Sequence, residues 1–165
     1  MANIQKITPF LWFDKNAEEA MNFYVSIFRN SKVVSIKRYE EDIPQSGVTG
    51  MVGKVLTAVF ELEGQKFMAL DGGPFFKPTG AVSFYVECDT QEEVDYYWNK
   101  LTEGGNPEAQ QCGWLQDKFG FSWQIIPKIL PELLNYPQKE KSDKVLQAML
   151  QMKKIDIALL KKAAE

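Results

Sequence analysis

The sequence predicts an α+β fold made of a repeated βαβββ unit, and two alignments of the chain with itself support this prediction. An amphipathic helix that follows a short apolar strand occurs twice, and Glu18-Glu19-Ala20 aligns with Glu92-Glu93-Val94 at an offset of about 74 positions. The last strands of the two halves align at an offset of about 56 positions, which places Gly64 over Gly120. The offsets differ because the first half contains the longer, glycine-rich segment 42–53. The alternative is chance similarity between two amphipathic stretches.

The first half shows the complete pattern of one strand, one helix and three strands. Residues 7–13 (ITPFLWF) form a short apolar run with aromatic side chains, which is typical of a strand. The apolar residues that follow have the spacing of one buried helix stripe: Ala20, Phe23, Tyr24, Ile27 and Phe28. Alternation predicts a strand over 32–40, and a hairpin signal at Glu63-Gly64-Gln65 joins strands 55–63 and 66–71.

The second half repeats this pattern after the segment DGGPFFKPTG. Residues 81–87 predict a strand, and the helix over 91–105 begins at Thr90, which can form a capping box with Glu93. Three more strands are expected, over 108–112, 114–117 and 121–126.

The residues after Pro127 have a different composition and predict helices. A short helix lies between prolines, Ser142 is the expected cap of a later helix, and Asp156 the expected cap of its restart. One side of this later stretch is apolar, so we expect it to rest on the domain or on a second subunit. That side consists of Val145, Leu146, Met149, Leu150 and Met152.

The composition excludes several classes of function. The chain contains no histidine and only two cysteines, which argues against histidine-based catalysis and the usual zinc sites. Its net charge is −3, which argues against nucleic-acid binding. Only Arg29 and Arg38 are arginines, so a polyanionic substrate is disfavoured. The start, MANIQKITPF, does not resemble a signal peptide, and no apolar run could span a membrane. A cytoplasmic protein without a membrane partner is therefore expected.

Four segments resemble one known family: ITPFLWFDKNAEEAMNFYVSIF, VLTAVFELEGQKFMALDGGP, CDTQEEVDYYWNKL and QCGWLQDKFGFSWQIIP. They resemble the vicinal oxygen chelate superfamily of glyoxalase, bleomycin-resistance and dioxygenase proteins, in its PhnB-like, 3-demethylubiquinone-9 3-methyltransferase-domain branch. The resemblance implies a U-shaped, eight-stranded mixed sheet with the helices outside, and pairing into a homodimer. It implies a glyoxalase-like domain over 1–135, with modules 4–73 and 80–128, and a helical extension over 136–165.

The implied cleft is lined by alternate strand residues, because successive side chains point to opposite faces of a strand. Phe10 and Trp12 should then face the helix, whereas Pro9, Leu11 and Phe13 should face the cleft. In the later strands Val82, Phe84, Val86, Trp123 and Ile125 should face the helix, and Ala81, Ser83, Tyr85, Ser122, Gln124 and Ile126 the cleft. The aromatic residues expected in the core are Trp12, Phe23, Tyr24, Tyr97, Trp98 and Trp123. The residues expected to line a ligand-binding cleft are Leu11, Met68, Phe75, Ser83, Tyr85, Trp114 and Gln124.

The metal ligands of the superfamily have few counterparts here. The matching positions are Pro9, Met68, Ser83 (or Ala81) and Gln124, of which only Gln124 is a plausible ligand. A lone neutral amide cannot hold a divalent ion against water, so no metal and no other cofactor is expected. Asp71, Glu87 and Asp117 are an alternative oxygen site, although solvated or turn-forming acids are the favoured interpretation. Cys88 and Cys112 have no activating neighbour and are interpreted as small core residues.

Three hypotheses for function remain open on the sequence alone. The favoured one is a metal-free protein that binds a small amphipathic organic molecule in its cleft. The second is an enzyme, either a lyase, isomerase or dioxygenase, or a methyltransferase as the family's inherited label suggests. The third is a dimeric interaction protein whose methionine-rich end holds a partner. No glycine-rich loop follows a strand in a βαβ unit, so the sequence itself lends the methyltransferase label no support.

Overall fold

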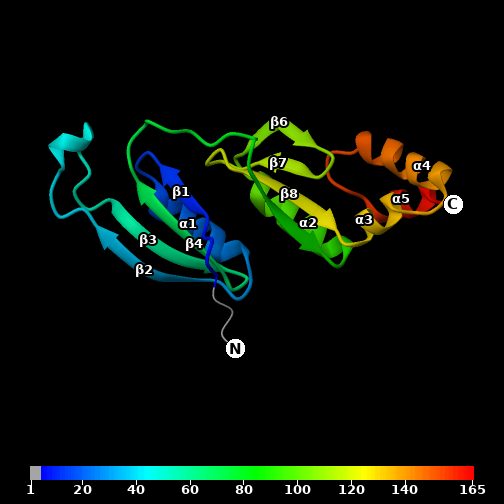
Figure 1. Cartoon of the computed structure of the whole chain (residues 1–165), viewed down its shortest axis with the longest axis horizontal. Helices are drawn as coiled ribbons and strands as arrows, with labels where there is room; N and C mark the ends of the chain where they lie inside the picture. Colours follow the sequence, from blue (N-terminus) through cyan, green and yellow to red (C-terminus); the bar gives the residue numbers. More distant parts are fainter. Residues whose placement is uncertain (1–4) are drawn as a thin grey trace. The chain divides into compact units, whose positions relative to one another are not determined.

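The computed structural model describes residues 5–165, apart from the side chain of Ser46. The chain forms two compact units, Met1–Lys77 and Pro78–Glu165, which we call unit 1 and unit 2. Each unit contains a four-stranded mixed sheet and a helix that packs on it (Figure 1). Residues 1–4 lie outside the described residues. They include the first residue of the predicted module 4–73 and the start of the segment that was compared with a signal peptide. Among residues 5–165, no helix is both long and apolar enough to cross a bilayer.

Unit 1 has the predicted βαβββ order. Its elements are β1 (Phe10–Phe13), α1 (Ala17–Ile27), β2 (Lys32–Arg38), the 3₁₀ turn η1 (Pro44–Ser46), β3 (Val55–Leu62) and β4 (Gln65–Asp71). The strands lie in the order β1-β4-β3-β2, with β1 parallel to β4 and the other neighbours antiparallel. The predicted hairpin is confirmed, since Glu63 (φ 48°) and Gly64 (φ 75°) form the two-residue left-handed turn between β3 and β4.

Unit 2 repeats this topology, which confirms the α+β class and the duplication of the βαβββ unit. Its elements are β5 (Ser83–Cys88), α2 (Gln91–Thr102), β6 (Asn106–Gln111), β7 (Trp114–Gln116) and β8 (Ser122–Pro127). The strand order is β5-β8-β7-β6, and only β5 and β8 run parallel. Cys112 (φ 52°) and Gly113 (φ 84°) make a left-handed turn between β6 and β7, so Cys112 ends outside the strand predicted over 108–112.

The two main helices begin with different caps. Thr90 Oγ1 accepts from the Glu93 N–H at 3.3 Å, and the Glu93 carboxylate accepts from the Asp89 N–H at 2.7 Å. This confirms the capping pair, although the return bond reaches one residue further back than in a capping box. Helix α1 has no side-chain cap of its own at Asn16. Its first N–H, from Ala17, donates instead to Asp71 of β4, at 2.8 Å.

The helix packs on one face of the unit 1 sheet, and this helix-covered face is not the one that the sequence predicted. Leu11 is 5% exposed and lies in register with fully buried Ala69, whereas Phe10 is 49% exposed and lies in register with Met68. Asp71, which bonds to the start of α1, belongs to the same alternate set as Leu11 and Phe13. Phe10 and Trp12 therefore occupy the opposite, open face.

The cause of this error is a slip of one residue in the internal alignment. Three residues, Asp14 to Asn16, separate β1 from α1, but only Asp89 and Thr90 separate β5 from α2. The offset between the first strands is therefore about 75 positions, not the 74 that holds for the helices, and a one-residue slip exchanges the two faces of a strand.

The face assignment is right in the second half except at Val82 and at Ile126, which shares the face of Gln124 but is buried by the C-terminal helices. Phe84 and Trp123 lie in register with ring centroids 5.0 Å apart, and Ile125 and Leu115 are buried on the same face. Val82 precedes β5 and is exposed, so it does not pack under α2. Of the aromatic residues predicted for the core, Tyr24, Tyr97, Trp98 and Trp123 are buried, Phe23 is half-buried, and Trp12 lies half-buried on the open face.

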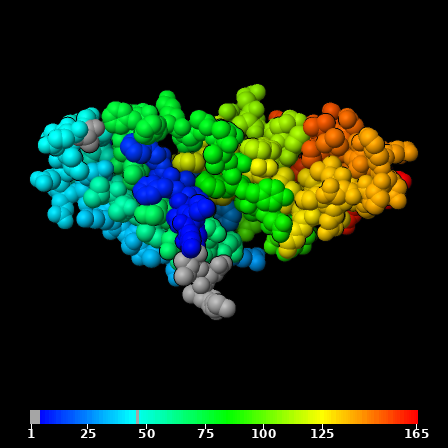
Figure 2. Space-filling view, viewed as in Figure 1, coloured from blue at the N-terminus to red at the C-terminus, as the bar shows by residue number. Residues whose placement is uncertain are grey.

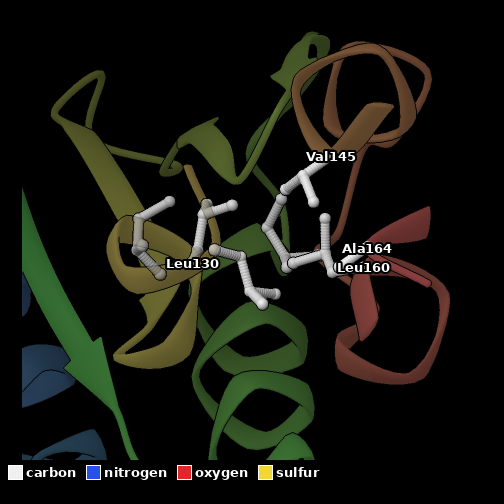
Figure 3. Close-up of a cluster of buried hydrophobic side chains, with 7 residues drawn as sticks. Leu130, Val145, Leu160 and Ala164 are labelled. Carbon is white, nitrogen blue, oxygen red and sulfur yellow. The ribbon is translucent and has the colours of Figure 1, made fainter. Parts of the chain in front are cut away.

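The C-terminal extension packs on unit 2 itself. It follows α3 (Ile129–Leu134) and contains α4 (Lys139–Leu150) and α5 (Ile157–Ala163). A buried apolar cluster joins these helices to the end of β8 (Figure 3), and in the space-filling view the orange extension lies directly against the yellow β8 and α3 residues (Figure 2). The cluster comprises Ile126, Leu130, Leu133, Val145, Ile155, Leu160 and Ala164.

Backbone hydrogen bonds reinforce this packing. The N–H groups of Cys112 and Gly113 donate to the carbonyls of Met152 and Lys153 at 2.8 and 2.7 Å. Asp156 caps α5 as predicted, because its carboxylate accepts from the Leu159 N–H at 2.9 Å. The cap predicted at Ser142 is wrong, since α4 already begins at Lys139 and the Ser142 hydroxyl donates back to the Lys139 carbonyl.

Candidate functional site

The open face of unit 2 carries two rows of side chains that run across strands β5, β8 and β7. Tyr85, Gln124 and Trp114 are neighbours in register and form the first row. Ser83, Ser122 and Gln116 form the second. The Gln124 amide nitrogen donates to the Ser83 hydroxyl at 2.8 Å and so ties the two rows together.

This pair of rows, which we call the amide platform, is uncharged and accessible. Tyr85 is 51% exposed, while Gln124, Trp114 and Ser83 are half-buried. A primary amide has two N–H donors and an acceptor oxygen, so the bond to Ser83 leaves Gln124 with capacity for a ligand. Partial burial, and then the nearby Glu87 carboxylate, raise the pKa of Tyr85 above its ordinary value, which keeps the phenol protonated at neutral pH.

The open face of unit 1 is apolar over β1 and the second half of β4, and it becomes charged toward Lys66, Glu61 and Lys32. Phe10, Trp12, Met68 and Leu70 alternate with the helix-covered residues of β1 and β4. The Trp12 indole N–H donates to the Gly73 carbonyl at 2.9 Å, and Phe76 packs edge-on against the indole with centroids 4.9 Å apart. A Cβ atom at Gly72 would lie 2.2 Å from the indole ring, so this position needs glycine. The loop after β4 thus fixes Trp12 on the open face.

The structure brings four of the seven predicted cleft residues together. Ser83, Tyr85, Gln124 and Trp114 all belong to the amide platform. Met68 lies on the open face of unit 1, and Phe75 is exposed in the loop that follows β4. Leu11 is 5% exposed and lies on the face of the unit 1 sheet opposite to Met68. The register slip also hid the open-face residues Phe10 and Trp12, which only a correct count of the β1–α1 connection could have found.

The residues at the superfamily's metal positions do not suit a divalent cation. The metal position on the first strand corresponds to Pro9 by the sequence or to Phe10 by its register with Met68. Neither side chain can donate to a metal ion. Ser83 and Gln124 offer only neutral oxygens, and divalent sites need three or four donors that usually include a charge. Within residues 5–165, no group of three or more histidine, cysteine or acidic side chains could hold a metal ion.

The two buried acids of the alternative oxygen site each accept hydrogen bonds within their own unit. Asp71 accepts from the Ala17 N–H and from the Val55 N–H, at 2.8 and 2.9 Å. Asp117 accepts from two turn N–H groups and from the Trp123 indole N–H at 2.8 Å, which confirms its expected role in a turn. Glu87 is exposed and lies 3.8 Å from the Lys128 ammonium.

The two cysteines differ in their surroundings. Cys88 is fully buried, and burial raises the pKa of its thiol to about 12, so it is an unreactive core residue as expected. Cys112 is half-buried in the β6–β7 turn, where its sulfur accepts from the Gln111 amide at 3.5 Å, so it is not the buried residue that the sequence predicted.

Two clefts lie away from the amide platform. A cleft of about 490 Å³ adjoins the start of α1 in unit 1, and one of about 500 Å³ lies between the first turns of α2 and α5 in unit 2. The first is lined by Lys15, Lys54 and acidic side chains, which Arg38 and backbone N–H groups already engage. Neither cleft gathers residues of one chemical type.

The comparison with protein families identifies the family to which this chain belongs. The family described as 3-demethylubiquinone-9 3-methyltransferase matches residues 5–126, which include both βαβββ units. The chain belongs to this family. It is thereby a PhnB-like member of the vicinal oxygen chelate superfamily, as the sequence motifs predicted. The family match ends inside β8, so the C-terminal extension lies beyond it.

One solved structure supports the same assignment, and another shares the fold alone. A PhnB protein from Bacillus cereus, described as a 3-demethylubiquinone-9 3-methyltransferase, is 45% identical, with a TM-score of 0.64 over 74% of this chain and 99% of its own. The protein PA1353 from Pseudomonas aeruginosa is 22% identical, with a TM-score of 0.58 over 75% of this chain and 98% of its own.

A third structure shares the fold alone. The fosfomycin resistance protein FosX from Listeria monocytogenes is 17% identical, with a TM-score of 0.55 over 82% of this chain and 100% of its own. A search of curated proteins found no significant match.

Proposed function

We propose that this protein binds a small amphipathic organic molecule on the amide platform of unit 2, without a resident metal ion. The observation that carries the proposal is the row Tyr85–Gln124–Trp114, in which one amide lies between two aromatic residues on an accessible sheet face. Ligand sites combine aromatic surface with a few oriented polar groups, and the bond from Gln124 to Ser83 orients this amide.

A metal-dependent mechanism finds no support in the donor set, which leads to the first prediction. Protein purified without chelators should contain far less than one equivalent of zinc, nickel, iron or manganese by elemental analysis. Addition of EDTA should leave the thermal unfolding midpoint unchanged, because no cluster of side chains among the described residues could bind a metal ion and so stabilise the fold. The proposal would be contradicted if the protein held one equivalent of metal and if its removal by EDTA lowered the unfolding midpoint.

The family's methyltransferase description is the competing function, and the local geometry does not favour it. Nucleoside cofactors usually bind a glycine-rich turn between a strand and a helix. The β1–α1 connection is Asp14-Lys15-Asn16 and the β5–α2 connection is Asp89-Thr90, neither of which contains glycine. Stoichiometric binding of S-adenosylmethionine by calorimetry would revive this function.

The second prediction concerns Gln124. In a thermal-shift screen of neutral and charged aromatic fragments, the wild-type protein should gain stability with some compounds, and Gln124→Ala should bind those compounds about tenfold more weakly. The control Gln45→Ala removes an exposed amide from unit 1 and should bind them like the wild type. Equal affinity of Gln124→Ala and wild type, with both proteins folded by circular dichroism, would remove the amide platform from the proposal.

A further inference from the structure

The strands of the amide platform lack positive charge. The open-face residues of β5, β7 and β8 include no lysine or arginine, and their one charged member is the acidic Glu87; the set is Ser83, Tyr85, Glu87, Trp114, Gln116, Ser122 and Gln124, since Ile126 on the same face is buried by the C-terminal helices. Arginine and lysine form the strong, charge-assisted hydrogen bonds to a carboxylate or phosphonate group. This face offers such a group hydroxyls and amides only.

Two basic side chains beside these strands have partners of their own. Lys128, which follows β8, pairs with Asp89 at 2.5 Å and with Glu87 at 3.8 Å. Lys118, in the β7–β8 turn, lies over the Phe119 ring at 5.1 Å from its centroid. Unit 2 contains no arginine. The strands of the amide platform therefore supply no cation of their own.

The spacing of the row limits the size of the ligand. Neighbouring strands lie about 4.8 Å apart, so the Tyr85 and Trp114 positions on either side of Gln124 are roughly 10 Å apart. This span suits a molecule of one or two fused rings that covers the amide. The amide and the protonated phenol can each donate and accept a hydrogen bond, which suits a ring with a carbonyl, carboxamide or hydroxyl edge.

We propose that the amide platform selects an uncharged, planar molecule of one or two rings with a carbonyl or amide edge, and that it rejects carboxylates and phosphonates. This inference rests on the proposed function and specifies its ligand class.

Matched pairs of compounds test the inference. The full-length protein is titrated with 2-naphthamide and 2-naphthoate, with benzamide and benzoate, and with phenylphosphonate, and binding is followed by ligand-observed NMR. In each pair the amide should bind at least tenfold more tightly than the anion, with an affinity that does not change with salt. If the anions bind as tightly as the amides or more tightly, charge selection is wrong while the proposed function stands. If no compound binds the folded protein, both proposals are wrong.

A charge added to the platform provides the matched variant. Tyr85→Lys places an ammonium beside Gln124 and should reduce the preference for the amide about tenfold, by attracting the anion at close range. Tyr96→Lys makes the same exchange at an exposed position of α2, which packs on the other face of the sheet, and should leave the preference unchanged. Equal effects of the two variants would show that net charge, and not the platform, sets selectivity.

Discussion

Replacing Asp71 by alanine should lower the free energy of unfolding by about 4 kcal/mol, one of the two largest effects expected in this protein. The Asp71 carboxylate is buried and accepts from the N–H groups of Ala17 and Val55. Each buried donor left without a partner costs about 1–3 kcal/mol, and alanine leaves two. Urea unfolding gives the total, and hydrogen exchange at the two amides shows where the loss occurs.

Two variants make this result specific. Asp71→Asn keeps the volume but can accept with only one of its two terminal atoms, so it should lose about half as much stability. Asp14→Ala removes an exposed acid from the β1–α1 connection and should change stability by less than about 0.5 kcal/mol. If Asp71→Ala behaves like Asp14→Ala, the carboxylate does not hold the start of α1.

Replacing Leu160 by alanine should cost about 3 kcal/mol, because its side chain is fully buried in the cluster that joins α3, α4 and α5 to β8. The adjacent residue supplies the matched control. Leu159 is 52% exposed on the same helix, so Leu159→Ala should change stability by less than about 0.5 kcal/mol. Urea unfolding of the two variants measures the difference.

The same pair of variants tests whether the extension belongs to unit 2. The amides of Cys112 and Gly113 donate to carbonyls of the extension. Their protection from hydrogen exchange should fall in Leu160→Ala and persist in Leu159→Ala, because weaker packing exposes these bonds to local opening. Equal protection in both variants would mean that the β6–β7 turn does not depend on the extension. Of the apolar side that the sequence predicted to need a cover, Val145 is buried within unit 2, whereas Leu146 and Leu150 are 38% and 42% exposed.

The sequence predicts part of the candidate site, because the alternation of apolar and polar residues is clear in some strands and not in others. Ser83, Tyr85 and Gln124 were assigned to the correct face because their strands connect to α2 and β7 through segments that the alternation pattern describes well. Leu11 was assigned to the wrong face because one extra residue before α1 has no signature in composition or periodicity. The sequence predicts only that Asp71 is an acidic residue in a turn. No local pattern indicates that its carboxylate accepts from the first N–H of α1.

The sequence by itself determined the two βαβββ units, the left-handed hairpin at Glu63-Gly64, the cap at Thr90 and the shortage of metal donors, because each of these depends on residues that are close in the chain or on residue types that are missing. Only the tertiary structure decided which face of β1 meets the helix, what satisfies the first N–H of α1, and where the apolar side of the extension is buried. These features depend on pairs such as Ala17 with Asp71, or Ile126 with Leu160, that are distant in sequence. Their partners are chosen by strand register and by the need to bury polar groups with a hydrogen bond, neither of which a local pattern records.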